Sequence, residues 1–252
     1  MVYNGYFNII FQALFIFNIH FRYHIYFLSI IILYSFSFGQ GDPDPERFNK
    51  NPRGNAVYID LFEYWDYKNS FPDNAVLFIG SSSIRKWSTS NYFTFTPVIN
   101  RGFGGSHISD IIYFIDKTVL KYKPKVVVLY AGDNDVASGK SAVDVFYDYK
   151  DFVSKIHNTI PETHIIFLPI KPSPKRWSFW PIMSETNSLI KEYNSQNLNL
   201  HYLDTATPML NKLGQPKPSL FISDSLHLSK AGYDLWSKTL EPILNKILNN
   251  TD

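Results

Sequence analysis

The sequence predicts an α/β domain, a three-layer α/β/α sandwich built on a roughly five-stranded parallel sheet. Two observations lead to this prediction. Short apolar runs rich in Val, Ile and Leu recur along the chain, and amphipathic stretches of helical length lie between them. Runs without a polar alternation are typical of parallel strands that are covered on both faces. At 252 residues, the chain has room for one such domain and an appendage.

The individual elements follow from the local patterns. Apolar, β-rich runs predict strands over 75–79, 97–99, 125–130, 164–168 and, more weakly, 200–203. Apolar residues at helical spacing predict helices over 57–68, 108–122, 141–160, 182–197 and 229–248. Ser229 is the expected N-cap of the last helix, because its hydroxyl can accept a hydrogen bond from the first turn.

The first 39 residues differ in composition from the rest of the chain. Their one formal charge is Arg22, and an apolar core over 26–34 is followed by the small-residue stretch that ends at Gly39. This order is typical of an export signal. We expect residues 1–39 to form a signal peptide that is cleaved near Gly39, leaving an exported protein, periplasmic or secreted. The alternative is an uncleaved N-terminal membrane segment. A polar linker over 40–54 and a domain over 55–252 are expected to follow.

Composition and charge exclude several classes of function. Net charge is +2, which gives no field that would attract nucleic acid, and cysteine is absent, which excludes disulfides. No stretch has the spacing of a zinc site. Gly139-Lys140-Ser141 imitates the end of a phosphate-binding loop, but Asn134 stands where that loop requires glycine. We expect a small-molecule or glycan partner, no nucleic acid, no metal and no cofactor, and membrane contact only through an uncleaved leader.

Polar clusters follow the first three predicted strands. They occupy 80–83, 100–106 and 131–135, and the pair Asp224 and His227 follows the last strand. Because ligands of open α/β sheets bind outside the carboxyl ends of the strands, we expect these clusters to meet at one edge. A serine hydroxyl becomes a good nucleophile when an imidazole, held by a carboxylate, takes its proton. The clusters therefore suggest a serine hydrolase.

Four blocks of the sequence resemble those of the SGNH, or GDSL-type, hydrolases. They are Gly80-Ser81-Ser82-Ser83, Asn100-Arg101-Gly102-Phe103-Gly104-Gly105, Gly132-Asp133-Asn134-Asp135 and Asp224-Ser225-Leu226-His227. Their order and spacing are also similar, and the resemblance covers about residues 73–248. It implies a flavodoxin-like fold and the activity of an esterase, lipase or acylhydrolase.

The resemblance also implies roles for individual residues. Ser82 would be the nucleophile, His227 the base and Asp224 the group that orients it. The backbone N–H of Ser82, together with Gly105 and Asn134, would form the oxyanion hole. The family often has aspartate where Ser81 stands here, which alters the charge beside the nucleophile but leaves the Ser82 hydroxyl in place.

Substrate contacts are expected from the loops around this edge. Trp177 and Trp180 could stack on a sugar ring or an acyl chain, Arg176 could bind an anionic group, and His107 could line the cleft. A Trp-rich loop that packs on its own domain is the alternative. We expect a serine esterase that cleaves an O-acetyl or short acyl ester on a carbohydrate or lipid. An acyltransferase with the same triad, or a catalytically silent glycan- or lipid-binding module, remains open.

Overall fold

A five-stranded, all-parallel sheet forms the centre of the molecule, as predicted. The structure is a computed structural model that describes residues 41–48 and 59–249. The strands pair in the order β2-β1-β3-β4-β5. Their bounds are β1 (Val76–Gly80), β2 (Val98–Asn100), β3 (Val126–Tyr130), β4 (His164–Phe167) and β5 (Leu200–Tyr202). This order is the flavodoxin-like one, in which β2 is added on one side of β1 and the later strands on the other. Ligands of such sheets bind at the switch point between β1 and β3, beyond the carboxyl ends of the strands.

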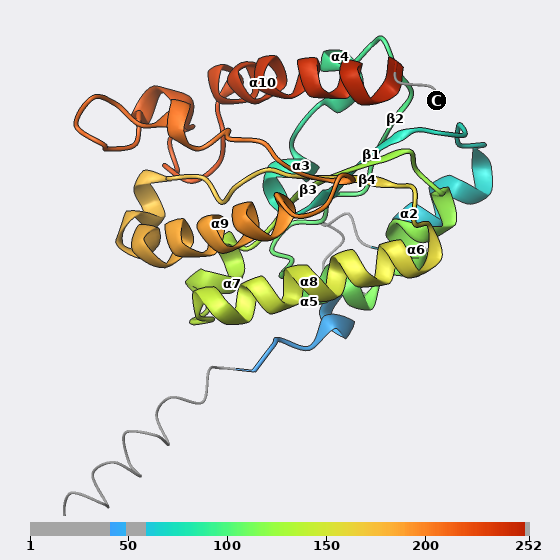
Figure 1. The fold of residues 1–252 in the computed structure, drawn as a ribbon, viewed down its shortest axis with the longest axis horizontal. Helices are drawn as coiled ribbons and strands as arrows, with labels where there is room; N and C mark the ends of the chain where they lie inside the picture. The colour runs from blue at the N-terminus through green and yellow to red at the C-terminus, as the bar shows by residue number, and fades with distance from the viewer. Residues whose placement is uncertain (1–40, 49–58, 250–252) are drawn as a thin grey trace, which may run out of the picture. The chain divides into compact units, whose positions relative to one another are not determined.

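Helices cover both faces of the sheet (Figure 1), with α10 on one side and α5, α8 and α9 on the other. The α-helices are α2 (Ile59–Lys68), α3 (Ser82–Arg85), α4 (Thr89–Tyr92), α5 (Ile108–Tyr113), α6 (Ile115–Thr118), α7 (Asp133–Ala137), α8 (Ala142–Thr159), α9 (Trp180–Asn194) and α10 (Lys230–Asn249). Short 3₁₀ turns are η1 (Pro45–Phe48), η2 (Leu120–Tyr122), η3 (Pro174–Phe179), η4 (Thr207–Met209) and η5 (Pro218–Leu220).

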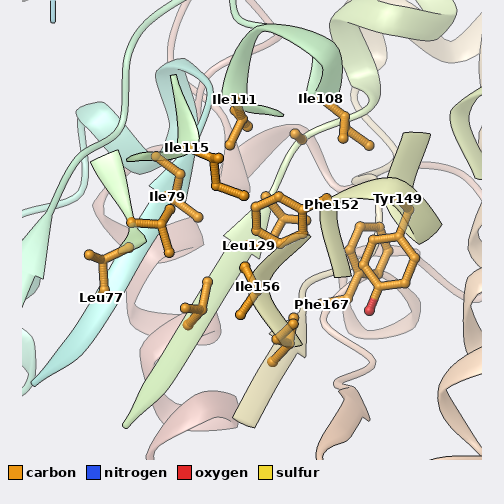
Figure 2. Packing of buried hydrophobic residues seen from close by; sticks show 14 of the residues in the cluster. Leu77, Ile79, Ile108, Ile111, Ile115, Leu129, Tyr149, Phe152, Ile156 and Phe167 are labelled. Carbon is orange, nitrogen blue, oxygen red and sulfur yellow. The ribbon is translucent and has the colours of Figure 1, made fainter. Parts of the chain in front are cut away.

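Successive strand residues enter two different hydrophobic clusters. Leu77, Ile79 and Leu129 pack with α5 and α8 in the first cluster, part of which is shown in Figure 2. Their neighbours Val76 and Phe78 face α10 in the second cluster. Because β1 and β3 are buried along their whole length on both faces, these two strands are apolar throughout, and this is why runs without alternation predicted them.

The helix expected over 108–122 is three short helical pieces. The chain leaves helical geometry at Phe114, where φ is −98° and ψ is 16°, and continues as α6 and η2. The carbonyl of Phe114 accepts hydrogen bonds from the backbone N–H groups of Lys117 and Thr118 and from the Thr118 hydroxyl. These bonds stabilise the break, although the apolar spacing of the segment remains helical. The other helices lie within a few residues of their expected bounds, and Ser229 accepts from Gly232 N as the expected N-cap.

Part of the expected linker packs on the domain. Asp42 contacts Lys140 and accepts a hydrogen bond from the Ser109 hydroxyl, and the ring of Phe48 lies edge-on to that of Phe103 at 4.9 Å between centroids. Arg47 forms an ion pair with Asp110. An apolar ring and several charged groups thus attach residues 42–48 to the domain. The expected leader and the rest of the linker lie outside the described residues, and within 41–48 and 59–249 no helix is long and apolar enough to cross a bilayer.

Candidate active site

Ser82 lies at the point where β1 ends and α3 begins. The preceding N–H, from Ser81, donates to the carbonyl of Tyr130 at 3.1 Å, which fixes the turn against the end of β3. Ser82 is then the first residue of a four-residue helix. A strand that is paired up to Gly80 and a helix that begins two residues later leave the Ser82 side chain at the carboxyl edge of the sheet, where the sequence placed it.

Asp224 and His227 are held by a turn that closes on itself. Asp224 Oδ1 accepts from the N–H groups of Leu226 and His227, each at 2.9 Å. Ser225 has a φ of +59°, in the left-handed region, and Ile222 N donates to His227 O at 2.9 Å. The acid and the base are thus fixed to one another by local backbone bonds, as well as by their side chains.

The turn brings His227 to Ser82 across 145 residues of sequence. His227 Nε2 lies 2.9 Å from Ser82 Oγ, and His227 Nδ1 lies 2.6 Å from Asp224 Oδ2. A carboxylate can only accept a hydrogen bond, so Nδ1 carries the proton of the neutral imidazole. This tautomer leaves the Nε2 lone pair free to accept the Ser82 hydroxyl proton, which is the geometry of a general base.

The carboxylate of this site is exposed. The side chain of Asp224 is 42% accessible and that of His227 is 18% accessible. Partial desolvation raises the pKa of Asp224, but hydrogen bonds from the His227 side chain and from the two backbone N–H groups outweigh it and hold the pKa far below its ordinary value. Asp224 is therefore a carboxylate at neutral pH.

The proposed oxyanion donors come from two further loops. Gly105 has a φ of +84°, and a Cβ built there would meet no atom within 4 Å. Glycine is therefore required for its backbone conformation, since the space beside it is open. Asn134, in α7, donates from Nδ2 to the carbonyl of Ser106 at 3.0 Å. This bond ties the loop after β3 to the loop after β2, on which Gly105 lies.

Asn100 is a residue of this region whose role sequence reasoning missed. Its Nδ2 donates to the carbonyls of Ile84 and Trp87, at 2.8 and 3.0 Å, and its Oδ1 accepts from Gly102 N at 3.0 Å. Gly102 packs so closely on α3 that a Cβ there would lie 2.4 Å from Arg85 N. Asn100 therefore fixes the loop after β2 on the helix that carries Ser82. Its place in the second block is the signal that could have found it, since the resemblance gives a role in that block to Gly105 alone.

The residues expected to contact substrate have other contacts in this structure. Trp177 and Trp180 stack on one another, with ring centroids 5.7 Å apart and planes 14° apart, and Trp180 also packs on the first hydrophobic cluster. Arg176 donates to Asn134 Oδ1 at 2.9 Å and pairs with Asp133. These contacts favour the alternative in which the loop packs on its own domain.

His107 is buried and is held by charged groups. Its backbone N–H donates to Asp110 Oδ2 at 2.7 Å, and its Nδ1 lies 3.6 Å from Asp42 Oδ1 and 4.0 Å from Asp135 Oδ1. Burial lowers the pKa of His107. These contacts explain the residue as a structural one at the start of α5, and they give no support to the expectation that it lines the cleft.

Asp135, next to Asn134, is a buried carboxyl group. Its Oδ1 accepts from Ile108 N at 3.0 Å and lies 3.7 Å from Lys140 Nζ. Burial dominates over these favourable contacts and raises the pKa of Asp135 to about 7, compared with 3.8 for an exposed group. Lys140, the residue that imitated a phosphate-binding lysine, is surrounded by Asp42, Asp135 and Asp148.

Stability is expected to depend on pH through Asp135. Between about pH 4 and pH 7 the unfolded chain loses this proton while the folded chain retains it, so the free energy of unfolding decreases as the pH rises through that range. Asp135→Asn should remove this part of the pH dependence, because an amide does not titrate and can still accept from Ile108 N. Urea unfolding at pH 4.5, 6 and 8 checks this. The exposed Asp60→Asn is the control, and parallel curves for parent and Asp135→Asn would contradict the assignment.

Within the two described segments, no group of three or more His, Cys, Asp or Glu side chains is arranged to hold a metal ion.

The fold has many relatives among solved structures. A GDSL-like lipase from Bacteroides thetaiotaomicron superposes with a TM-score of 0.65 at 19% identity, covering 75% of this chain and 97% of its own. A catalytic variant of an acetylxylan esterase from Geobacillus stearothermophilus gives a TM-score of 0.58 at 15% identity, covering 71% of this chain and 95% of its own. At such identities the likeness shows the fold alone. No curated protein has significant sequence similarity to the chain.

A match to a family model assigns the chain to a protein family, which the structural likeness alone does not do. The model of the GDSL-like lipase/acylhydrolase family matches residues 85–235, which include Gly105, Asn134, Asp224 and His227. The match begins three residues after Ser82, so the candidacy of Ser82 as nucleophile rests on the first of the four blocks and on its contact with His227. Since the match spans more than half of the chain and the resemblance in the four blocks predicted the same family, the chain belongs to the GDSL-like lipase/acylhydrolase family of carboxylic ester hydrolases.

Proposed function

We propose that this protein is a serine esterase that hydrolyses an O-acetyl or short acyl ester on a carbohydrate or lipid through an acyl-enzyme on Ser82. The observation that carries the proposal is the continuous path of two hydrogen bonds from Ser82 Oγ through His227 to Asp224, at 2.9 and 2.6 Å. Residues 145 positions apart meet in the geometry that activates a hydroxyl.

In the proposed reaction, His227 Nε2 takes the hydroxyl proton as Ser82 Oγ attacks the ester carbonyl. The carbonyl oxygen becomes negatively charged in the tetrahedral intermediate and would accept from the N–H groups of Ser82 and Gly105 and from Asn134 Nδ2. Collapse breaks the bond to the alcohol, which leaves with the proton from His227. Water then attacks the acyl-enzyme, His227 again takes a proton, and the acid is released as Ser82 recovers its hydrogen.

Three observations support a short acyl group on a sugar. One structural neighbour is an acetylxylan esterase, and the exposed carboxylate of Asp224 leaves one side of the site open to a bulky alcohol portion. The outer face of the Trp177 and Trp180 pair could still stack on a sugar ring. A lipid headgroup satisfies the same requirement for an open alcohol side, so the proposal keeps both classes.

Export is proposed from the composition of residues 1–39, which has the order of a signal sequence with cleavage near Gly39. N-terminal sequencing of protein recovered outside the cytoplasm tests it. A mature N-terminus within a few residues of position 40 is expected, and an intact leader in the membrane fraction would show an anchored protein instead.

The proposed function is tested by covalent labelling and a substrate panel. A fluorophosphonate probe should add one label per chain, on the tryptic peptide that contains Ser82, and p-nitrophenyl acetate should be hydrolysed faster than longer acyl esters. Acetylated xylan and lysophospholipid distinguish the two alcohol classes, and added sugar acceptors reveal any transfer of the acyl group. Absence of both labelling and turnover, with measurable glycan binding, would replace the esterase with a binding module.

A further inference from the structure

We propose that Arg176 is a positioning residue of the oxyanion hole, which acts by fixing the carboxamide of Asn134. The inference rests on the proposed function and gives Arg176 a different task from the substrate contact that the sequence suggested. Its basis is the contact of Arg176 Nη2 with Asn134 Oδ1, at 2.9 Å between residues 42 positions apart.

The two partners of Asn134 leave its amide only one orientation. A guanidinium group can only donate hydrogen bonds, so the atom of Asn134 that faces Arg176 has to be the oxygen. The carbonyl of Ser106 can only accept, so the atom that faces it, at 3.0 Å, has to be the nitrogen. A rotated amide would lose both bonds. One hydrogen of Nδ2 is engaged by Ser106, and the second stays available for an oxyanion.

Arg176 also changes the strength of this donor. A positive charge at the amide oxygen draws electron density away from the amide nitrogen, so the remaining Nδ2–H becomes a stronger hydrogen-bond donor. A neutral residue at position 176 could fill the same space but would not polarise the amide.

Arg176 is itself held in place by a buried ion pair. Arg176 Nη1 lies 3.1 Å from Asp133 Oδ2, and the same oxygen lies 3.1 Å from Lys171 Nζ. Lys171 is almost completely buried and donates to the hydroxyl of Tyr130 at 2.8 Å. Burial raises the pKa of Asp133, but Lys171 and Arg176 outweigh it, and the net pKa is lowered. Asp133 is thus a fixed negative charge that holds the guanidinium beside Asn134.

The loop that carries Arg176 also contacts the turn with the acid and base. The N–H of Lys175, the residue before Arg176, donates to the carbonyl of Ser225 at 3.0 Å. One loop therefore contacts both the turn with Asp224 and His227 and the side chain of Asn134. These contacts can hold the acid–base pair and the oxyanion donor in fixed positions relative to one another.

The contacts argue against a role for Arg176 in binding an anionic substrate. The two terminal nitrogens of the guanidinium already face Asp133 and Asn134, and the side chain is 18% accessible. A substrate anion would have to compete with a carboxylate that is almost completely buried.

The test measures kcat and KM separately for p-nitrophenyl acetate. Arg176→Ala should lower kcat about tenfold with KM changed less than about twofold, a smaller loss than the roughly 10²- to 10³-fold for Asn134→Ala, which removes the donor itself. Arg176→Lys should recover part of the rate.

In the Asn134→Ala background, Arg176→Ala should lower kcat no further, because no amide is left to position. Lys175→Ala, an exposed cation on the same loop whose backbone bond survives, should match the parent.

Several results would overturn the inference. A raised KM with unchanged kcat in Arg176→Ala would make Arg176 a substrate contact, and equal losses in the parent and Asn134→Ala backgrounds would make its effect independent of Asn134. Thermal unfolding checks that each variant is folded, and Arg176→Met is the substitute if the alanine variant is not.

A readout without turnover separates this inference from the proposed function. In NMR spectra, the side-chain amide of Asn134, identified by its loss in Asn134→Ala, should exchange slowly with solvent in the parent and faster in Arg176→Ala. If the parent hydrolyses no ester, the proposed function fails and this comparison still decides the role of Arg176. Identical exchange in both proteins would reject it.

Discussion

Replacement of Ser82 by alanine is expected to lower kcat/KM for p-nitrophenyl acetate by about 10⁴- to 10⁶-fold and to abolish labelling by a fluorophosphonate. The reason is that the acyl-enzyme cannot form without the Oγ atom, which lies 2.9 Å from His227 Nε2. Residual activity would come from direct attack of water on the ester, with the oxyanion donors still stabilising the negative charge on the carbonyl oxygen. Stopped assays at high enzyme concentration measure the remaining rate, and the unfolding temperature checks the fold.

Ser83→Ala is the matched control for this experiment. Ser83 is the next residue, it is buried, and its hydroxyl has no hydrogen-bond partner among the described residues. It should retain the rate of the parent. A Ser82→Ala protein that remains fully active, or a Ser83→Ala protein that loses activity, would show that the nucleophile has been misassigned.

Replacement of His227 by alanine is the second large effect, again about 10⁴- to 10⁶-fold in kcat. Without the imidazole nothing accepts the proton of Ser82 and nothing returns a proton to the departing alcohol, so both acylation and deacylation slow. Labelling at Ser82 should fall with the rate. The measurement is kcat from initial rates over a range of pH, with His157→Gln, a partly buried histidine on α8, as the control.

Asp224→Asn, in the same turn, is expected to lower kcat less than His227→Ala does. Buried triads lose about 10⁴-fold in kcat when the acid becomes an amide, since the imidazole then adopts the wrong tautomer. Here the carboxylate is 42% accessible, so water can replace part of what it supplies, and a loss of about 10²- to 10³-fold is expected. A loss as large as that of His227→Ala would indicate that the exposed acid is nevertheless indispensable.

The fold could be predicted because burial on both faces of a strand leaves a direct mark on the sequence. Leu77 and Phe78 face opposite clusters, so neither face of β1 could be polar. The segment over 108–122 shows the limit of this reasoning. Its apolar spacing is helical throughout, but the break at Phe114 depends on hydrogen bonds to one carbonyl, which spacing does not reveal.

The sequence predicted the candidate catalytic residues but not the residues that hold the site in place. Ser82, Asp224 and His227 belong to short patterns, and the structure brings them within hydrogen-bonding distance. The contact of Arg176 with Asn134 and the contact of Lys171 with Asp133 join residues 42 and 38 positions apart, so they depend on how two distant loops fold over one another. The sequence suggested a substrate contact for Arg176 and no role for Lys171, because Arg and Lys side chains are mostly exposed, whereas the fold buries Lys171 and turns Arg176 toward Asp133 and Asn134.

The self-closing turn from Ile222 to His227 makes the acid and base behave as one rigid unit. Since their mutual alignment is set by bonds inside six residues, a shift of the surrounding loops displaces both together and leaves their own pairing intact. For the acid and base, a change in the neighbouring loops therefore alters only the separation between the imidazole and the nucleophilic oxygen, 2.9 Å here, and not the alignment of the imidazole with its carboxylate.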